Sequence, residues 1–270
     1  MSTKSAMQTD GRERRMSIEY GWRYDPRSHE LLLRTCQNLR ELGGYDCAYG
    51  VTKMRRFLRS GATRGIGTKD LQFLRDEGVT RVLDLRSRGE EPAVTCAFSR
   101  VPWAMWENVP LFDYDLSAPA MMPVRDVDNY LVTSYLRMLT NEEAIRGALV
   151  FLAQTPPDEC ALFHCAAGMD RTGVVSMLLL GLAQVPRRQI IKDYALSFGE
   201  VDDVESTIDA LEGKLDAPTT PYAYILDTRV RTIATVYDTI VATHGSIWDF
   251  LRHCDVPATQ LDALVRHLVS

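Results

Sequence analysis

One cysteine and one arginine stand six positions apart in a segment that could bind an anion. The stretch FHCAAGMDRTG, residues 163–173, places Cys165 at the end of an apolar run and Arg171 just before a longer one. Small residues between them would let the backbone approach a ligand closely. The loop residues that would face this ligand are Ala166, Ala167, Gly168, Met169 and Asp170.

These residue types together indicate chemistry on an oxyanion. In a tight turn that leads into a helix, the backbone N–H groups of residues 166–170 would point at phosphate, sulfate or vanadate. Arg171 offers a planar fork for two oxygens of the anion. Positive surroundings favour the thiolate form of Cys165, and Thr172 could donate a hydrogen bond to its sulfur. We therefore expect Cys165 to be a nucleophile, against the alternative of a buried structural cysteine beside a solvated arginine.

The neighbouring segments predict where this loop lies. CALFHC, residues 160–165, is a continuous apolar run, which is typical of a strand covered on both faces. Residues 172–184 are apolar nearly all round and predict a buried helix. The loop would then connect the carboxyl end of a strand to a helix, which is where open parallel sheets bind ligands.

Alternating strands and helices predict the fold class. We expect an α/β fold with a mostly parallel central sheet flanked by helices, followed by a helical C-terminal part. Strands are expected at residues 50–60, 79–85, 107–112 and 160–165. Helices are expected at residues 69–77, with Thr68 as N-cap, and at residues 126–140, 142–154, 172–184, 189–196, 204–215, 222–243, 246–253 and 259–268.

Composition bounds the class of protein. A chain of 270 residues that is 46% hydrophobic can bury one sizeable core. We expect a flexible N-terminal arm over residues 1–16 and a single domain over residues 17–270, with a helical elaboration at about residues 187–270. The formal net charge of -5 argues against a nucleic-acid partner. Cysteine and histidine show no metal-ligand spacing, so we expect no metal and no cofactor.

The expected location follows from two segments. The first residues contain no apolar core of the kind that a signal peptide needs. The longest apolar stretch, residues 174–185, is too short to span a bilayer. We expect no stable membrane insertion and a cytoplasmic location, with export that needs no cleaved signal left open.

The pattern H-C-x-x-G-x-x-R-T-G, residues 164–173, resembles the signature of the cysteine-dependent protein tyrosine phosphatase superfamily. The stretches NLRELGGY, RFLRSG and VLDLRSRGEE follow the motif order of a bacterial branch that acts on phosphotyrosine and often on phosphoinositides. The ending SIWDFLRHCDVPATQLDALVRHLV is also similar, so the resemblance covers roughly residues 30–269. It implies a protein tyrosine phosphatase-like fold and a phosphorylated protein or phosphoinositide as substrate.

The resemblance also implies a mechanism in two steps. Cys165 attacks phosphorus while a general acid protonates the leaving oxygen, and water then hydrolyses the phosphocysteine. Arg171 and the loop amides hold the remaining oxygens. The acid stays open among four aspartates. The order of preference is Asp170 inside the loop, Asp84 at the end of a neighbouring strand, then Asp113 and Asp115.

Met169 is the main departure from the phosphoinositide-type loop, which usually carries a lysine there. A neutral side chain favours an aryl phosphate such as phosphotyrosine over a polyanionic headgroup. Four arginines could restore the charge or could be structurally paired: Arg40, Arg59, Arg86 and Arg88. His164 should point away from Cys165, because successive side chains of a strand alternate, and would support the loop.

Three alternatives to a protein phosphatase remain. A phosphate-binding module without turnover would keep Arg171 but lack a working acid. A phosphoinositide phosphatase would use the same loop on a lipid. A sulfur-transfer or arsenate-reducing enzyme is disfavoured by the R-T-G helix start and by the lack of a suitably spaced resolving cysteine.

Overall fold

The computed structural model describes residues 24–25, 27–31, 33, 35–90, 95–112, 124–216 and 220–269. The expected N-terminal arm lies outside these ranges, and so do Asp113 and Asp115. Within the described ranges, no helix is both long and apolar enough to span a bilayer.

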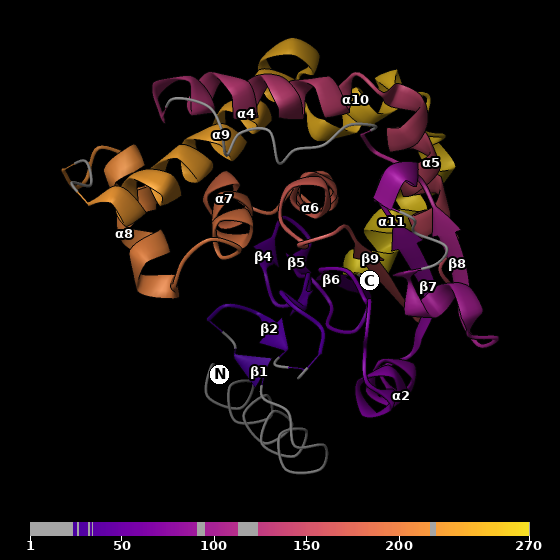
Figure 1. Cartoon of the computed structure of the whole chain (residues 1–270). Helices are drawn as coiled ribbons and strands as arrows, with labels where there is room; N and C mark the ends of the chain where they lie inside the picture. The colour runs from indigo at the N-terminus through magenta and orange to yellow at the C-terminus, as the bar shows by residue number, and fades with distance from the viewer. Residues whose placement is uncertain are drawn as a thin grey trace, which may run out of the picture.

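A seven-stranded sheet forms the centre of the protein (Figure 1). Four parallel strands lie in the order β6 (Phe57–Ser60), β9 (Cys160–His164), β7 (Val79–Asp84) and β8 (Met105–Asn108). Three short antiparallel strands extend the β6 edge, namely β3 (Arg40–Glu41), β2 (Glu30–Leu31) and β1 (Tyr24–Asp25). A separate hairpin contains β4 (Asp46–Cys47) and β5 (Gly50–Val51). The strand that precedes the loop, β9, therefore has hydrogen-bonded neighbours on both sides.

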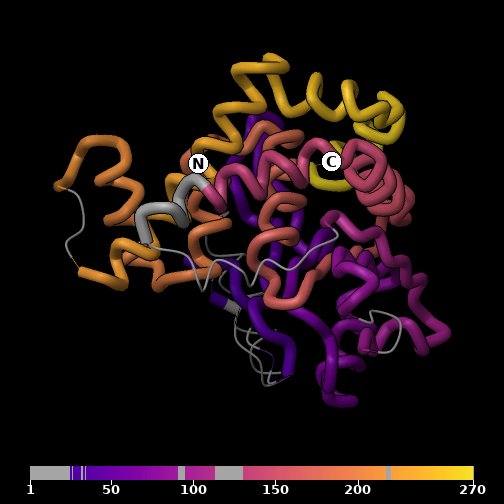
Figure 2. The backbone as a smooth tube through the Cα atoms, turned by 45° about the horizontal axis from the view of Figure 1, so that its top comes forward, coloured from indigo at the N-terminus to yellow at the C-terminus, as the bar shows by residue number. Residues whose placement is uncertain are grey.

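Helices cover both faces of this sheet. On one face, α6 (Asp170–Leu182) and α7 (Arg187–Ala195) lie between the sheet and an outer layer of α4 (Val124–Leu139) and α9 (Pro221–His244) (Figure 1). The same side holds α5 (Glu142–Ala153), α10 (Ile247–His253) and α11 (Ala258–Val269). Helix α8 (Val201–Leu211) lies at one end of the molecule (Figure 2). The opposite face carries α2 (Thr68–Asp76) and the 3₁₀ turn η2 (Ala97–Arg100), and another 3₁₀ turn, η1 (Arg88–Glu90), follows β7.

Alternation along β9 divides the core into two clusters. Ala161 and Phe163 pack in the cluster on the α6 side, whereas Cys160 and Leu162 pack in the cluster with α2. All five residues of β9 are buried, as expected for a strand covered on both faces. The fold-class prediction of a mostly parallel sheet flanked by helices is confirmed.

Two strand predictions were inaccurate. The segment 50–60 is not one strand, because its middle residues separate β5 from β6. The strand expected at residues 107–112 begins earlier, at Met105, and ends at Asn108. Strands β1 to β3 were not predicted, since pairs of residues are too short to show a period-2 pattern. The predicted helices are all present with shifted ends, and α6 begins at Asp170, two residues before the expected start.

Glu41 is a carboxyl group buried in the antiparallel edge of the sheet. It is 2% exposed, and its two oxygens each accept a hydrogen bond of 3.1 Å from the backbone N–H of Arg55. Burial, reinforced by the nearby charge of Glu77, raises the pKa of Glu41 from 4.5 to about 8. The folded protein therefore holds this proton more tightly than the unfolded chain does.

Glu41→Gln should change how stability depends on pH. Because the folded pKa lies above the unfolded one, the contribution of Glu41 is fully present below pH 4.5 and is lost as pH rises through about 8. The variant should gain stability relative to the parent across this window, by at most about 1.4 kcal/mol per pH unit. Urea unfolding at several pH values measures the difference. Glu143→Gln, at an exposed position on α5, is the control, and parallel curves for Glu41→Gln and the parent would contradict the expectation.

Candidate functional site

The loop between β9 and α6 is packed tightly against the end of β6. Cys165, its first residue, is 2% exposed and belongs to the core cluster on the α6 side. Gly168 has a φ of +73°, and a Cβ there would lie 2.5 Å from the backbone nitrogen of Gly61. Only glycine meets both the conformation and the close approach. The sequence therefore brings the loop directly onto the backbone of a neighbouring strand.

The carbonyl groups of residues 165–168 all accept hydrogen bonds from groups on the outer side of the loop. Their donors come from the preceding histidine, from the segment after β6, and from two side chains on β6 and the turn before β3. The bonds are Cys165 O with His164 Nδ1 at 3.1 Å, Ala166 O with Ala62 N at 2.8 Å, Ala167 O with Asn38 Nδ2 at 3.4 Å, and Gly168 O with Asn38 Nδ2 at 2.8 Å and Arg59 Nη2 at 2.9 Å.

These bonds orient the amide groups of the loop. In a planar trans peptide the N–H points opposite to the C=O, so outward carbonyls turn the N–H groups of residues 166–169 inward. Among the described residues, none accepts a hydrogen bond from these four N–H groups. Together with the N-terminus of α6 they form a set of free donors of the kind that binds phosphate or sulfate.

Arg171 lies in the first turn of α6 and is fixed by a carboxylate. Its Nη1 and Nη2 contact the two oxygens of Glu90 at 2.5 and 3.1 Å. Glu90 also accepts bonds from the N–H and Oγ of Ser87, at 2.8 and 3.0 Å. Burial alone would raise the pKa of Glu90, but the bonds from Arg171 outweigh it and lower that pKa below its usual value. The guanidinium is thus held in one orientation as a cation.

Two buried polar atoms of the motif have no partner among the described residues. They are Nε of Arg171 and Oγ1 of Thr172. A buried donor without an acceptor is costly, and native structures keep few of them. Both atoms belong to the turn that follows Cys165. An anion on the loop and a thiolate at Cys165 would supply the missing acceptors.

Asp170, the first residue of α6, is positioned by the C-terminal helices. Its Oδ1 accepts a bond of 2.8 Å from Nη1 of Arg229 on α9, and another from the hydroxyl of Tyr135 on α4. Tyr135 in turn contacts the hydroxyl of Tyr194 on α7 at 2.6 Å. The Asp170 side chain is 25% exposed, and among the described residues Oδ2 has no hydrogen-bond partner. This second oxygen is therefore available to a bound molecule.

Asp84, the other predicted acid in the described ranges, lies in a different environment. It is the last residue of β7 and pairs in register with His164, so both side chains lie on the face opposite to Cys165. The Asp84 carboxylate is fully buried and accepts bonds from the Arg86 guanidinium at 2.6 and 2.9 Å. The expectation that Asp84 could face the pocket is thus not met, because its oxygens are inaccessible and paired.

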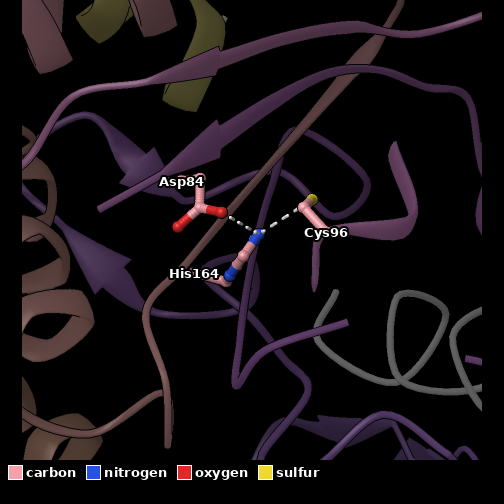
Figure 3. Close-up of side chains that lie close together, drawn as sticks. All are labelled: Asp84, Cys96 and His164. Carbon is pink, nitrogen blue, oxygen red and sulfur yellow. Dashed lines mark hydrogen bonds and ion pairs between the residues drawn. The ribbon is translucent and has the colours of Figure 1, made fainter. Parts of the chain in front are cut away.

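Asp84, Cys96 and His164 lie close enough to resemble metal ligands. Figure 3 shows Asp84 and Cys96 on either side of one ring nitrogen of His164. An Asp84 oxygen lies 3.7 Å from this Nε2 atom, and the Cys96 sulfur lies 3.5 Å from it. Burial raises the pKa of Cys96 and lowers that of His164, which favours a thiol and a neutral ring. The Arg86 cation already balances the carboxylate and would repel a metal ion. The cluster fits a hydrogen-bonded support for the loop better than a metal site.

Three of the four arginines considered from the sequence are buried and do not add charge at the open side of the loop. Arg40 and Arg59 are 2% and 0% exposed and lie behind the loop, while Arg86 is paired with Asp84. Arg88 is exposed on η1. Sequence reasoning did not assign Glu90, Tyr135 or Arg229. Glu90 stands in the RSRGEE stretch, but a charged run of this kind is also typical of a solvated turn.

Asp84→Asn should destabilise the fold by about 3–5 kcal/mol, because it leaves the buried Arg86 cation without its counter-charge. Chemical unfolding measures the loss. The matched control is Asp238→Asn, which breaks a pair with Arg187 at 2.7 Å between side chains 55% and 37% exposed. That control should cost less than about 1 kcal/mol. EDTA should leave the melting temperature unchanged, and a melting temperature that rises with added Zn²⁺ and falls with EDTA would show a metal site instead.

Comparison with known proteins agrees with this geometry. A model of the tyrosine phosphatase family matches residues 31–270. A Cupriavidus necator protein, provisionally named a tyrosine-protein phosphatase, is 28% identical over 86% of this chain and 87% of its own length. The triple specificity protein phosphatase PtpB of Mycobacterium tuberculosis is 26% identical over 81% of this chain and 94% of its own. Since the family model spans far more than half of the sequence, the chain belongs to the tyrosine phosphatase family.

Proposed function

We propose that the chain is a cysteine-dependent phosphomonoester hydrolase that acts on phosphotyrosine through a phosphocysteine intermediate. The observation that supports this most strongly is the set of unpaired donors around Cys165. Four inward N–H groups and the unbonded Nε of Arg171 match the oxygens of a phosphoryl group. Family membership supports the same reaction class.

In the first step, Sγ of Cys165 attacks phosphorus in line with the leaving oxygen. The S–P bond forms as the bond from phosphorus to the leaving oxygen breaks, and Asp170 gives that oxygen a proton. The loop amides and Arg171 hold the three remaining oxygens, where negative charge is spread in the transition state. Oδ2 of Asp170 suits the acid role because Tyr135 and Arg229 both bind Oδ1.

In the second step, water attacks the phosphocysteine. Asp170 accepts a proton from this water, the P–S bond breaks, and inorganic phosphate leaves with the thiolate restored. The unpaired Oγ1 of Thr172 can donate a hydrogen bond to the departing sulfur. No redox or metal partner is needed to balance either step.

The substrate class follows from the neutral residue in the loop. Met169 adds no charge beside the phosphate, and Arg40, Arg59 and Arg86 are buried, so no cation among them meets a polyanionic headgroup. We therefore rank phosphotyrosine first, with phosphoserine, phosphothreonine and phosphoinositides as weaker substrates. The name of the mycobacterial relative, a triple specificity phosphatase, supports keeping all of them in the panel.

The protein should release phosphate from p-nitrophenyl phosphate and from a phosphotyrosine peptide, faster than from phosphoserine peptides or phosphoinositides at equal concentration. Vanadate should inhibit. Cys165→Ser should lower kcat at least about 10⁴-fold, as loss of a covalent nucleophile does elsewhere. Cys254→Ser, at a buried cysteine after α10, is the control. Phosphate binding without release of product would instead support a non-catalytic module, and fastest turnover of phosphoinositides would reverse the substrate ranking.

Asp170→Asn should separate substrates by their leaving groups. An alkyl phosphate needs its leaving oxygen protonated, so its kcat should fall about 10²–10⁴-fold. p-Nitrophenolate is a good leaving group and needs little acid, so its rate should fall much less. Asp203→Asn replaces an exposed first-turn aspartate of α8 and should leave both rates unchanged. Equal losses on both substrates would move the acid role to Asp113 or Asp115.

A further inference from the structure

Two side chains behind the anion loop contact it only through its carbonyl groups. Asn38 lies in the turn before β3, and Arg59 lies on β6. We propose that both are positioning residues, which hold the peptide between Gly168 and Met169 in the orientation that binds phosphate. This inference rests on the proposed function, because it concerns the same loop and the same anion.

Asn38 reaches the loop at the cost of an unusual backbone. Its φ is +53°, in the left-handed region that asparagine tolerates better than most residues. Its Nδ2 donates to Gly168 O at 2.8 Å and lies 3.4 Å from Ala167 O. A side-chain amide has two N–H donors, so one group can hold two successive carbonyls. The turn therefore presents Asn38 as a clamp on consecutive loop peptides.

Arg59 holds the same carbonyl from a second direction. It is 0% exposed, and its Nη2 donates to Gly168 O at 2.9 Å. Its Nη1 forms an ion pair with Asp193 on α7, whose other oxygen accepts a bond of 3.1 Å from the Tyr45 hydroxyl. The guanidinium is consequently fixed by α7 and cannot follow the loop if the loop moves. Gly168 O thus accepts hydrogen bonds from two donors, both of which also lie 3.3 Å from Ser197 Oγ.

Glycine makes this clamp necessary. Gly168 has no Cβ to restrict its backbone, so the peptide that follows it could rotate at little steric cost. Rotation would remove the N–H of Met169 from the anion and put a carbonyl oxygen in its place, which repels phosphate. The close approach to Gly61 forbids any other residue at this position. Orientation must therefore come from hydrogen bonds to the Gly168 carbonyl rather than from the residue's own conformational preference.

The same region holds two buried arginines behind the loop. Arg59 forms an ion pair with Asp193 on α7, whereas Arg40 donates to Ser197 Oγ at 2.8 Å and pairs in register with Glu30 on β2. Burial and the neighbouring Arg59 lower the pKa of Arg40 to about 10, so Arg40 is charged at neutral pH. A cation behind the loop favours an anion in front of it.

Asn38→Gly tests the side-chain contacts alone. Glycine adopts the same positive φ without strain, while the hydrogen bonds to the Gly168 and Ala167 carbonyls are lost. We expect kcat for p-nitrophenyl phosphate to fall about 10- to 100-fold, because the N–H groups of the loop stabilise the transition state more than the bound substrate. KM should rise less than kcat falls, and inorganic phosphate should bind about tenfold more weakly. Asn38→Asp, which replaces the donor with an acceptor, should lose at least as much.

The matched control is Asn141→Gly, which removes another contact between an asparagine side chain and the backbone. Asn141 caps α5 by accepting a bond of 3.3 Å from the N–H of Ala144. The Asn141→Gly variant should lose stability without losing activity or phosphate affinity. If both Asn38 variants keep the parent's kcat, KM and phosphate affinity, the clamp is overturned while the proposed function stands.

Measuring the binding of inorganic phosphate distinguishes failure of the proposed function from failure of the proposed role of Asn38 and Arg59. If the parent protein binds phosphate but releases no product, the proposed function fails, and weaker binding by Asn38→Gly would still support the clamp. If the parent neither binds phosphate nor turns over substrate, both proposals fail.

Discussion

The site depends on the hydrogen bonds that pull the loop carbonyls outward. A peptide carries its donor and acceptor on opposite sides, so a loop can present N–H groups to an anion only if its C=O groups are satisfied elsewhere. The donors to these carbonyls come from three parts of the chain and are His164, Ala62, Asn38 and Arg59. Three of these four supports come from β6, from the segment after it and from the turn before β3, so the loop depends on the parallel pairing of β9 with β6.

Charged side chains lie both at the loop and behind it. Arg171 is paired with Glu90 and held in a fixed geometry, whereas Arg40 and Arg59 are buried behind the loop. Asp170 forms an ion pair with Arg229 on α9, so the helical C-terminal part reaches the first turn of α6 beside the loop. Because backbone N–H groups are the donors of the loop, an apolar side chain at position 169 is compatible with phosphate binding. In the proposed function, the loop amides rather than a lysine would supply most of the donors to the anion.

Much of this arrangement was predictable from local pattern. The continuous apolar run of β9 and the all-round apolar α6 identified the strand, the helix and the loop between them. The alternation of side chains placed His164 on the face opposite to Cys165. The two-residue strands at the sheet edge could not be predicted, because their pairing depends on neighbours distant in sequence. Asp84 was misjudged for a related reason, since strand position alone does not reveal the arginine that occupies its carboxylate.

The sequence by itself determined the candidate loop, because a cysteine, small residues and an arginine at fixed spacing between a strand and a helix can form an anion-binding turn. Such a motif is local, and its residues are held together by the covalent chain. The tertiary structure alone decided which groups support that loop. Glu90, Asn38, Arg59 and Arg229 approach it from separate elements, and no sequence spacing connects them to Cys165. Their distances are set by the packing of the sheet against its helices.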